Sequence, residues 1–161
     1  MLKAMKRNGW LGVGGVWVVA GSMAAAAPSR SPDDGAWRPL STTARGVTGD
    51  IVLGDEKLTI NFTTFPLAEI RILKPEEATA AFPADTAGGG GGELYRVSIP
   101  AEKKFLHKNT LCGSEETQWV ATYVEGKTLH LSLFSGPKMP VFTPEAMADG
   151  SNVCGTFSYV R

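Results

Sequence analysis

The sequence predicts an all-β domain, either a small antiparallel β-barrel or a β-sandwich of about seven to eight strands. Apolar and polar residues alternate with a period of two over several short runs. Turns rich in Gly, Pro and Asp separate these runs at short intervals. No long amphipathic helical pattern lies between them, so the alternation of strands and helices that is typical of parallel α/β folds is absent.

The first 26 residues have the three-part layout of a secretory signal peptide. The basic start comes from three residues: Lys3, Lys6 and Arg7. An apolar run at 10–20 follows, which is too short to span a bilayer, and then a tract of small residues at 21–27. We expect cleavage before Ala27 and a periplasmic or secreted protein that does not span the membrane.

The chain after the predicted cleavage site is mildly acidic and of single-domain length. Residues 1–26 contain three of the 16 Lys and Arg and none of the 16 Asp and Glu, so 13 basic residues remain against 16 acidic ones, a net charge of −3. A nucleic-acid binder would normally show a basic excess, so no nucleic-acid partner is expected. Residues 27–36 are rich in Pro, Ser and Asp and predict a flexible lead-in. Residues 37–161 then form one β-domain.

The first half of the domain predicts a hairpin flanked by further strands. Alternation predicts strands at 51–53, 58–62 and 67–73, and a strand at 37–40 would bring the total to eight. A turn at 54–56 joins the first two of these runs. Three residues are expected to face inward from the second run: Leu58, Ile60 and Phe62. Three more are expected to face inward from the third: Ala68, Ile70 and Ile72.

The middle of the chain predicts little regular structure. Pro75 is suited to open a short helical turn that runs to Ala78. The tract at 84–92 contains five consecutive glycines, which lose the most backbone entropy when they are ordered. We therefore expect a flexible surface connector there.

The second half repeats the strand pattern and adds one helix. Alternation predicts four strands: 94–99, 118–124, 128–134 and 153–160. His130 lies opposite the apolar face of the third of these strands and is expected to face solvent. A short helix is predicted at 143–149, where Thr143 is a suitable N-cap, Pro144 suits the first turn and Gly150 ends the helix.

The two cysteines, Cys112 and Cys154, are expected to form a disulfide, because an isolated pair in an exported chain is typically oxidised. Such a bond closes a loop of 43 residues, counted inclusively, and stabilises the fold by up to about 4 kcal/mol. The alternative is a zinc site formed by both cysteines with His107 and His130. The spacing of these four residues matches no common zinc pattern, so we expect no metal site.

No residue set in the sequence indicates catalysis. Ser114 lacks the glycine pattern of a nucleophile elbow, and the adjacent carboxylates at 115–116 are typical of a solvated loop. His107 lies among lysines, which suits an exposed basic position better than a general base. We therefore expect neither catalytic residues nor a cofactor, and the protein is predicted not to be an enzyme.

The only local basic cluster consists of Lys103, Lys104 and Lys108, which could attract an anionic partner. It lies in the segment 101–117, which the predicted disulfide would hold near the segment 135–152. Loops that are held rigid bind partners better than loose ones. The leading hypothesis is therefore an exported, non-enzymatic domain that binds an unknown protein or envelope component, inhibition being one form of such binding.

Two resemblances bear on this hypothesis. Gly35-x-Trp37, followed by antiparallel strands, resembles the opening of lipocalin-type barrels. The chain is also similar in size, export signal and single disulfide to small exported bacterial barrels that inhibit proteases or lysozymes, and we assign no family from either likeness. The first resemblance implies an alternative function as a barrel that carries a small apolar ligand, although the bulky inward residues favour a filled core. An envelope enzyme is the third hypothesis.

Overall fold

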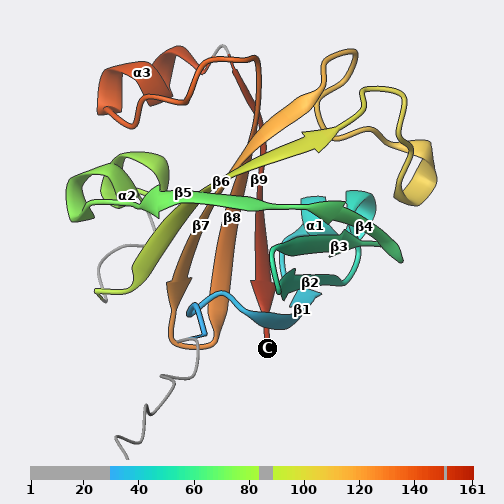
Figure 1. The fold of residues 1–161 in the computed structure, drawn as a ribbon, viewed down its shortest axis with the longest axis horizontal. Helices are drawn as coiled ribbons and strands as arrows, with labels where there is room; N and C mark the ends of the chain where they lie inside the picture. The colour runs from blue at the N-terminus through green and yellow to red at the C-terminus, as the bar shows by residue number, and fades with distance from the viewer. Residues whose placement is uncertain (1–29, 84–88, 151) are drawn as a thin grey trace, which may run out of the picture.

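The computed structural model describes residues 30–83, 89–150 and 152–161 (Figure 1). The predicted signal peptide at 1–26 lies outside these ranges. So do residues 27–29 of the predicted lead-in and residues 84–88 of the glycine-rich tract.

Nine antiparallel strands form a single sheet, which confirms the all-β prediction. The strands are β1 (Gly35–Pro39), β2 (Ile51–Gly54), β3 (Lys57–Ile60), β4 (Thr63–Pro66), β5 (Ala68–Ile72), β6 (Gly91–Ile99), β7 (Thr117–Glu125), β8 (Thr128–Ser135) and β9 (Val153–Val160). Their order across the sheet is β4-β3-β2-β1-β9-β8-β7-β6-β5. Every predicted strand is present, and β4 is additional. Its Pro66 suggested a break, but proline is tolerated at the end of an edge strand.

The helices are short: α1 (Thr42–Val47), α2 (Pro75–Ala81), the 3-10 turn η1 (Leu106–Lys108) and α3 (Pro144–Asp149). The predicted helix at 143–149 is confirmed as α3. The Thr143 hydroxyl accepts a hydrogen bond from the Ala146 N–H at 3.2 Å, and Gly150 ends the helix at a φ of +59°. Such a left-handed residue is the usual stop signal of a helix.

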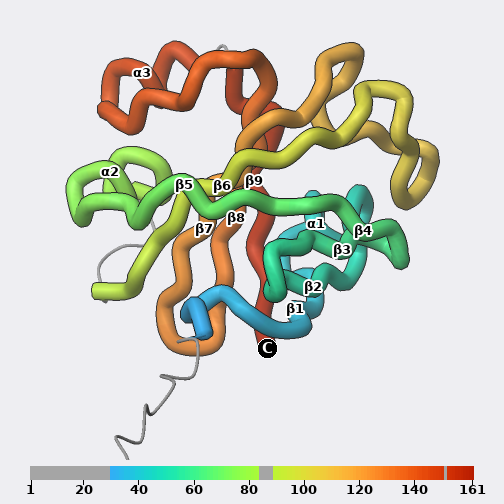
Figure 2. The backbone as a smooth tube through the Cα atoms, in the orientation of Figure 1, coloured from blue at the N-terminus to red at the C-terminus, as the bar shows by residue number. Residues whose placement is uncertain are grey.

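The sheet curls strongly but does not close into a barrel. Its two edge strands, β4 and β5, are consecutive in the chain and are joined by Leu67 alone. Figure 2 shows this continuous segment running across the strands β6–β9. β4 pairs with β3 and also packs against β6, while β5 pairs with β6. One bent segment therefore bridges both edges of the sheet.

The curled sheet has two cores. The inner core lies between β1–β4 and β6–β9 and includes Trp37, Leu58 and Leu129. The outer core lies on the other face, where α2 and α3 cover residues such as Trp119 and Phe134. Because both faces of β7 and β8 are covered, these strands are buried almost throughout. A period of two in apolar and polar residues is typical of strands with one solvated face, and β7 and β8 have no such face.

His130 shows the consequence of the second core. The prediction placed it in solvent, but its exposed fraction is 7%. Its ring lies 6.3 Å from that of Phe82 and 6.4 Å from that of Tyr123, and its Nδ1 is 3.2 Å from the Ser158 hydroxyl. Phe82, the residue that follows α2, therefore packs on the face of β8 that the alternation assigned to water.

The predicted inward face of β5 is also wrong. Ala68, Ile70 and Ile72 are exposed, the last by 68%. Leu67 and Leu73, which flank the strand, are buried instead, the first in the inner core and the second in the outer core. The pairing of β5 with β6 shifts its register between Glu69 and Arg71, so a strict period of two cannot apply along this strand.

The glycines at 90–92 are ordered parts of the sheet rather than a connector. β6 begins at Gly91, and the Gly90 N–H donates to the Tyr123 hydroxyl at 2.7 Å. A Cβ at Gly90 would lie 2.0 Å from the Val124 carbonyl oxygen, and one at Gly92 would lie 2.7 Å from the Thr122 carbonyl oxygen. Glycine is therefore required here because the backbones of β6 and β7 approach too closely for a side chain.

The end of the predicted lead-in is also packed. β1 begins at Gly35, before the expected start of order at residue 37, and the Asp33 side chain is only 2% exposed. The polar composition was misleading because the polar groups of this segment make hydrogen bonds inside the protein.

Candidate functional site

The predicted disulfide between Cys112 and Cys154 is present, with a Cα–Cα distance of 4.7 Å. Cys112 lies in the loop that follows β6, and Cys154 lies in β9. The Thr117 hydroxyl donates to the Cys112 sulfur at 3.0 Å. Because both sulfurs are bonded to each other, the alternative zinc site with His107 and His130 is not formed.

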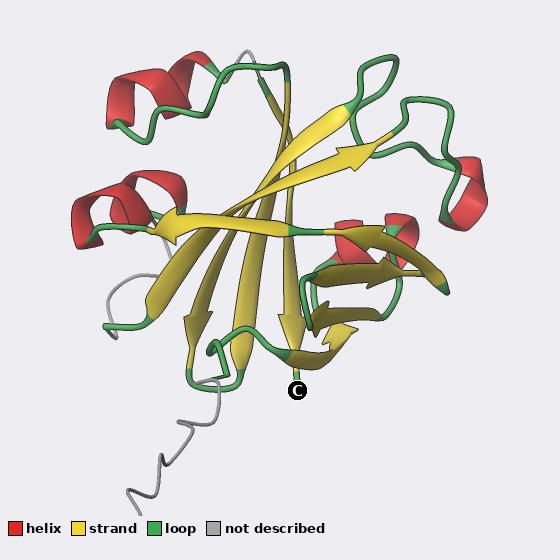
Figure 3. Ribbon diagram, in the orientation of Figure 1, coloured by secondary structure: helices red, strands yellow, loops and turns green. Residues whose placement is uncertain are grey.

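The two loops that the disulfide was expected to hold together extend in different directions (Figure 3). The loop 100–116 carries η1 and packs against α1, whereas the loop 135–152 carries α3 and packs against α2. The disulfide joins the first loop to the strand that begins just after the second one. It therefore fixes the base of the loops and leaves two separate surfaces.

The loop 100–116 has buried anchors and exposed charges. Phe105 belongs to the inner core, and the Lys103 ammonium lies 6.0 Å from the centre of its ring. Lys104 and Lys108 are exposed. The Asn109 side-chain amide donates to the Gly46 carbonyl oxygen at 3.1 Å, which ties the loop to α1. The basic cluster is thus presented on a loop whose backbone is held at several points.

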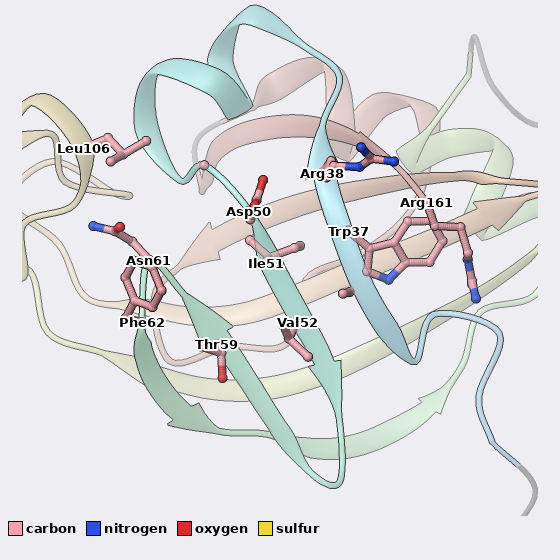
Figure 4. A pocket seen from close by; sticks show the side chains of 12 residues that line it. Trp37, Arg38, Asp50, Ile51, Val52, Thr59, Asn61, Phe62, Leu106 and Arg161 are labelled. Atoms are coloured by element: carbon pink, nitrogen blue, oxygen red, sulfur yellow. The ribbon is translucent and has the colours of Figure 1, made fainter.

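A cleft of about 600 Å³ lies beside this loop, on the outer face of β1–β3 (Figure 4). The sequence did not predict it, because its residues come from five separate segments. It is lined by Ala36, Trp37, Arg38, Gly49, Asp50, Ile51, Val52, Thr59, Asn61, Phe62, Leu106 and Arg161. We call it the outer cleft. Its size suits a few side chains of a bound partner.

Phe62 lies at one end of the outer cleft and is 99% exposed. Alternation predicted that it faces the core, but β3 ends at Ile60, and Asn61 and Phe62 form the turn to β4. Their φ angles are +46° and +65°. Asparagine tolerates this left-handed conformation, whereas a bulky residue there is unfavourable by roughly 1–2 kcal/mol. Phe62 thus combines an unfavourable backbone with a fully exposed phenyl ring.

The opposite end of the outer cleft carries two guanidinium groups. The Arg161 guanidinium lies 4.0 Å above the Trp37 ring, and its nitrogens donate to the backbone carbonyl oxygens of Pro32 and Asp34. Arg38 is exposed on β1. Figure 4 shows both arginines at the end away from Phe62. A cation stacked on an indole in this way has a well-defined position.

Leu106 connects the outer cleft to the basic loop. It lines the cleft, and a Cβ at Gly49 would lie 3.1 Å from its Cδ1 atom, so the two segments are in close contact. Lys104 and Lys108 are each two residues away from Leu106 in the same loop. The predicted basic residues therefore lie in the loop next to the outer cleft and not in its lining, and their role in binding stays a prediction.

Within the described parts of the chain, histidine, cysteine, aspartate and glutamate side chains do not gather in any group of three or more that could hold a metal ion. Helices of the length and apolarity needed to cross a membrane are likewise not found among these residues. Comparison with family models, with curated proteins and with solved structures finds no match for this chain.

Proposed function

We propose that this protein is an exported, non-enzymatic binding domain that holds a segment of a partner protein in the outer cleft. The supporting observation is Phe62, which is 99% exposed in a left-handed conformation at the rim of the cleft. Both features are unfavourable for the free protein. A residue that is unfavourable for stability and lies beside a concave surface is typical of a functional position.

The chemistry of the outer cleft favours a partner segment that is both apolar and acidic. Phe62, Leu106 and Val52 offer apolar contacts. The lining contains two guanidinium groups, those of Arg38 and Arg161, and one carboxylate, that of Asp50. Lys104 and Lys108 extend the positive charge onto the neighbouring loop, where it would accelerate association with an acidic partner and orient it.

A second candidate function is the binding of a small apolar ligand at a different place. The inner core of the described residues is packed with bulky side chains such as Trp37 and Leu58, which argues against a lipocalin-type cavity in the interior of the sheet. A groove of about 860 Å³ lies instead between α2 and α3, where Ala80, Pro83 and Met147 contribute to an apolar lining. Native mass spectrometry of protein purified from its own host would detect a ligand retained there.

Site-specific photo-crosslinking tests the main proposal. A photoreactive phenylalanine analogue at position 62 should form a crosslink with one discrete partner in an envelope extract. The same analogue at position 72 is the matched control, because Ile72 is also an exposed apolar residue and lies on β5. Comparable crosslinking at both positions, or no crosslink at position 62, would contradict the proposal.

Charge reversal tests the contribution of the basic loop. Lys104→Glu combined with Lys108→Glu should lower the yield of the crosslink at position 62. The yield should also depend less on the salt concentration than in the protein with both lysines. Lys138→Glu is the control, because Lys138 is exposed on the other loop, 135–152. If Lys138→Glu has the larger effect, the partner binds the α3 side of the molecule instead.

A further inference from the structure

Residues 30–34, which we call the N-terminal strap, lie across one end of the inner core (blue in Figure 1). The strap is held by both its backbone and its side chains. The Trp37 indole N–H donates to the Asp33 carbonyl oxygen at 2.7 Å, and Arg161 donates to the carbonyl oxygens of Pro32 and Asp34. The Asp33 carboxyl is buried beneath the strap.

Two carboxyl groups meet at a single tyrosine under the strap. The Tyr95 hydroxyl oxygen lies 2.9 Å and 3.1 Å from the two Asp33 carboxyl oxygens and is also in hydrogen-bond contact with the Glu93 carboxyl. The Thr122 hydroxyl donates to Asp33 at 2.8 Å, and the Ser31 hydroxyl donates to Glu93 at 2.5 Å. The two carboxyls therefore connect the strap to β6 and β7.

The number of hydrogens in this cluster requires one protonated carboxyl. The Tyr95 hydroxyl has one hydrogen, which it can share between the two oxygens of Asp33 but cannot also give to Glu93. If both carboxyls were ionised, one of them would face the lone pairs of the tyrosine oxygen without a hydrogen between them. The arrangement is complete when Glu93 carries a proton and donates it to Tyr95, which in turn donates to Asp33.

The surroundings of Glu93 favour the protonated form. Its carboxyl faces Ser31 and Asp33 of the strap, Tyr95 of its own strand and Glu69 of β5, while the Thr122 hydroxyl of β7 donates to its backbone carbonyl oxygen. Burial raises the pKa of Glu93 most, and the negative charges of Asp33 and Glu69 raise it further, against the hydrogen bonds from Ser31 and Tyr95. Neither Asp33 nor Glu93 takes part in a salt bridge in the described ranges.

Tyr95 itself cannot act as the acid of this cluster. Burial and the hydrogen bond to Glu93 raise the pKa of its phenol well above the ordinary value, so its hydroxyl keeps its hydrogen over the whole range in which carboxyls titrate. The proton that is gained or lost there is the carboxyl proton.

We propose that the N-terminal strap is a pH-sensitive latch, which is closed while Glu93 holds a proton and opens when that proton is lost. The closed state binds one proton more than the open state, because Glu93 is solvated and ionised once the strap is released. Opening therefore becomes more favourable as the pH rises. This is opposite to the usual acid-induced loosening of a protein.

The proposal predicts a limited pH range for the effect. The opening equilibrium should rise by up to about tenfold per pH unit between the ordinary pKa of a glutamate, about 4.3, and the raised pKa of Glu93 in the closed state. Above the raised value it should reach a plateau. The latch does not rest on the proposed binding function, and each proposal can be tested without the other.

Hydrogen exchange measured by mass spectrometry on the peptide that covers residues 30–37 tests the latch between pH 5 and pH 8. After correction for the intrinsic exchange rate, the protection of this peptide should fall with rising pH, while that of a β8 peptide should stay constant. Glu93→Gln should remove the pH dependence, because the amide still donates a hydrogen to Tyr95 and cannot ionise. Glu102→Gln is the control, since Glu102 is an exposed carboxyl outside the cluster.

Two results would overturn the latch. The first is protection of residues 30–37 that does not change with pH in the unmodified protein. The second is a Glu93→Gln variant that retains the pH dependence of the unmodified protein, because the titrating group would then lie elsewhere. If Glu93→Gln does not fold, a carbon-13 NMR titration of the Glu93 carboxyl in the unmodified protein decides the question. An apparent pKa above the ordinary value supports the latch, and a value at or below it contradicts the latch.

Discussion

Replacing Phe62 by glycine should stabilise the free protein and weaken partner binding at the same time. Phe62 is 99% exposed, so its removal deletes no packing inside the molecule. Its φ of +65° lies in the left-handed region, which glycine adopts without the steric conflict of a Cβ. The variant therefore separates the stability of the fold from its proposed function.

The expected gain follows from two opposing contributions. Relief of the left-handed conformation stabilises the folded state by about 1–2 kcal/mol. Glycine also increases the conformational entropy of the unfolded chain, which offsets about 0.5–1 kcal/mol of this gain. The net stabilisation should be about 0.5–1 kcal/mol, which corresponds to a rise in Tm of about 2–4 °C for a domain of this size.

Urea unfolding followed by circular dichroism measures this gain. The unfolding midpoint of Phe62→Gly should rise without a change in the slope m, because the surface exposed on unfolding hardly changes. Phe62→Asn should behave similarly, since asparagine also tolerates the left-handed region. Ile72→Gly is the opposite control, because glycine within a strand is destabilising. Two results would refute the reasoning. One is a loss of stability in Phe62→Gly. The other is an unchanged crosslink yield when the photoreactive group is placed at residue 61 of that variant.

Three further changes test the fold. Gly92→Ala should destabilise the protein by about 1–3 kcal/mol in urea unfolding, because the new Cβ would lie 2.7 Å from the Thr122 carbonyl oxygen. If this variant is as stable as the unmodified protein, β6 can shift away from β7. Replacing both Cys112 and Cys154 by serine should cost up to about 4 kcal/mol in the same assay, and an equal effect of reductant on the unmodified protein would assign the loss to the disulfide. The hydrogen bonds from Arg71 lower the pKa of Glu77 to about 2, so this pair contributes stability above the ordinary glutamate pKa that is lost as the pH falls toward 2. Because both side chains are partly exposed to solvent, Glu77→Gln should cost only about 1 kcal/mol at pH 7 and clearly less at pH 2, and an equal cost at both pH values would contradict this assignment.

Local patterns determined a large part of this fold. The hairpins β2–β3 and β7–β8 were predicted because their alternation and their turns lie within a few residues of one another. The helix α3 was predicted from its cap, proline and glycine, which also act within one short segment. The disulfide followed from the presence of only two cysteines. Each of these features depends on information that is close together in the chain or is a simple count.

Only the tertiary structure decided which faces are buried. Alternation indicates that a strand has two different sides, but it does not reveal that Phe82 and Tyr123 pack against His130 on the second side of β8. Alternation also does not predict the register shift in β5. It does not predict that β3 ends at Ile60, so that Phe62 lies outside the sheet. These outcomes depend on packing between segments that are distant in sequence.

The outer cleft and the strap depend on such packing entirely. Tyr95 and Asp33 are 62 residues apart, and Thr122 and Asp33 are 89 apart, yet their side chains form one hydrogen-bonded cluster. The sequence by itself determined that this chain forms a β-domain with one disulfide, because those properties reside in local composition, periodicity and the number of cysteines. The positions of the outer cleft, the N-terminal strap and the Asp33–Glu93 cluster were decided only when the curled sheet brought remote segments together, because burial and charge depend on the neighbours of a side chain in space.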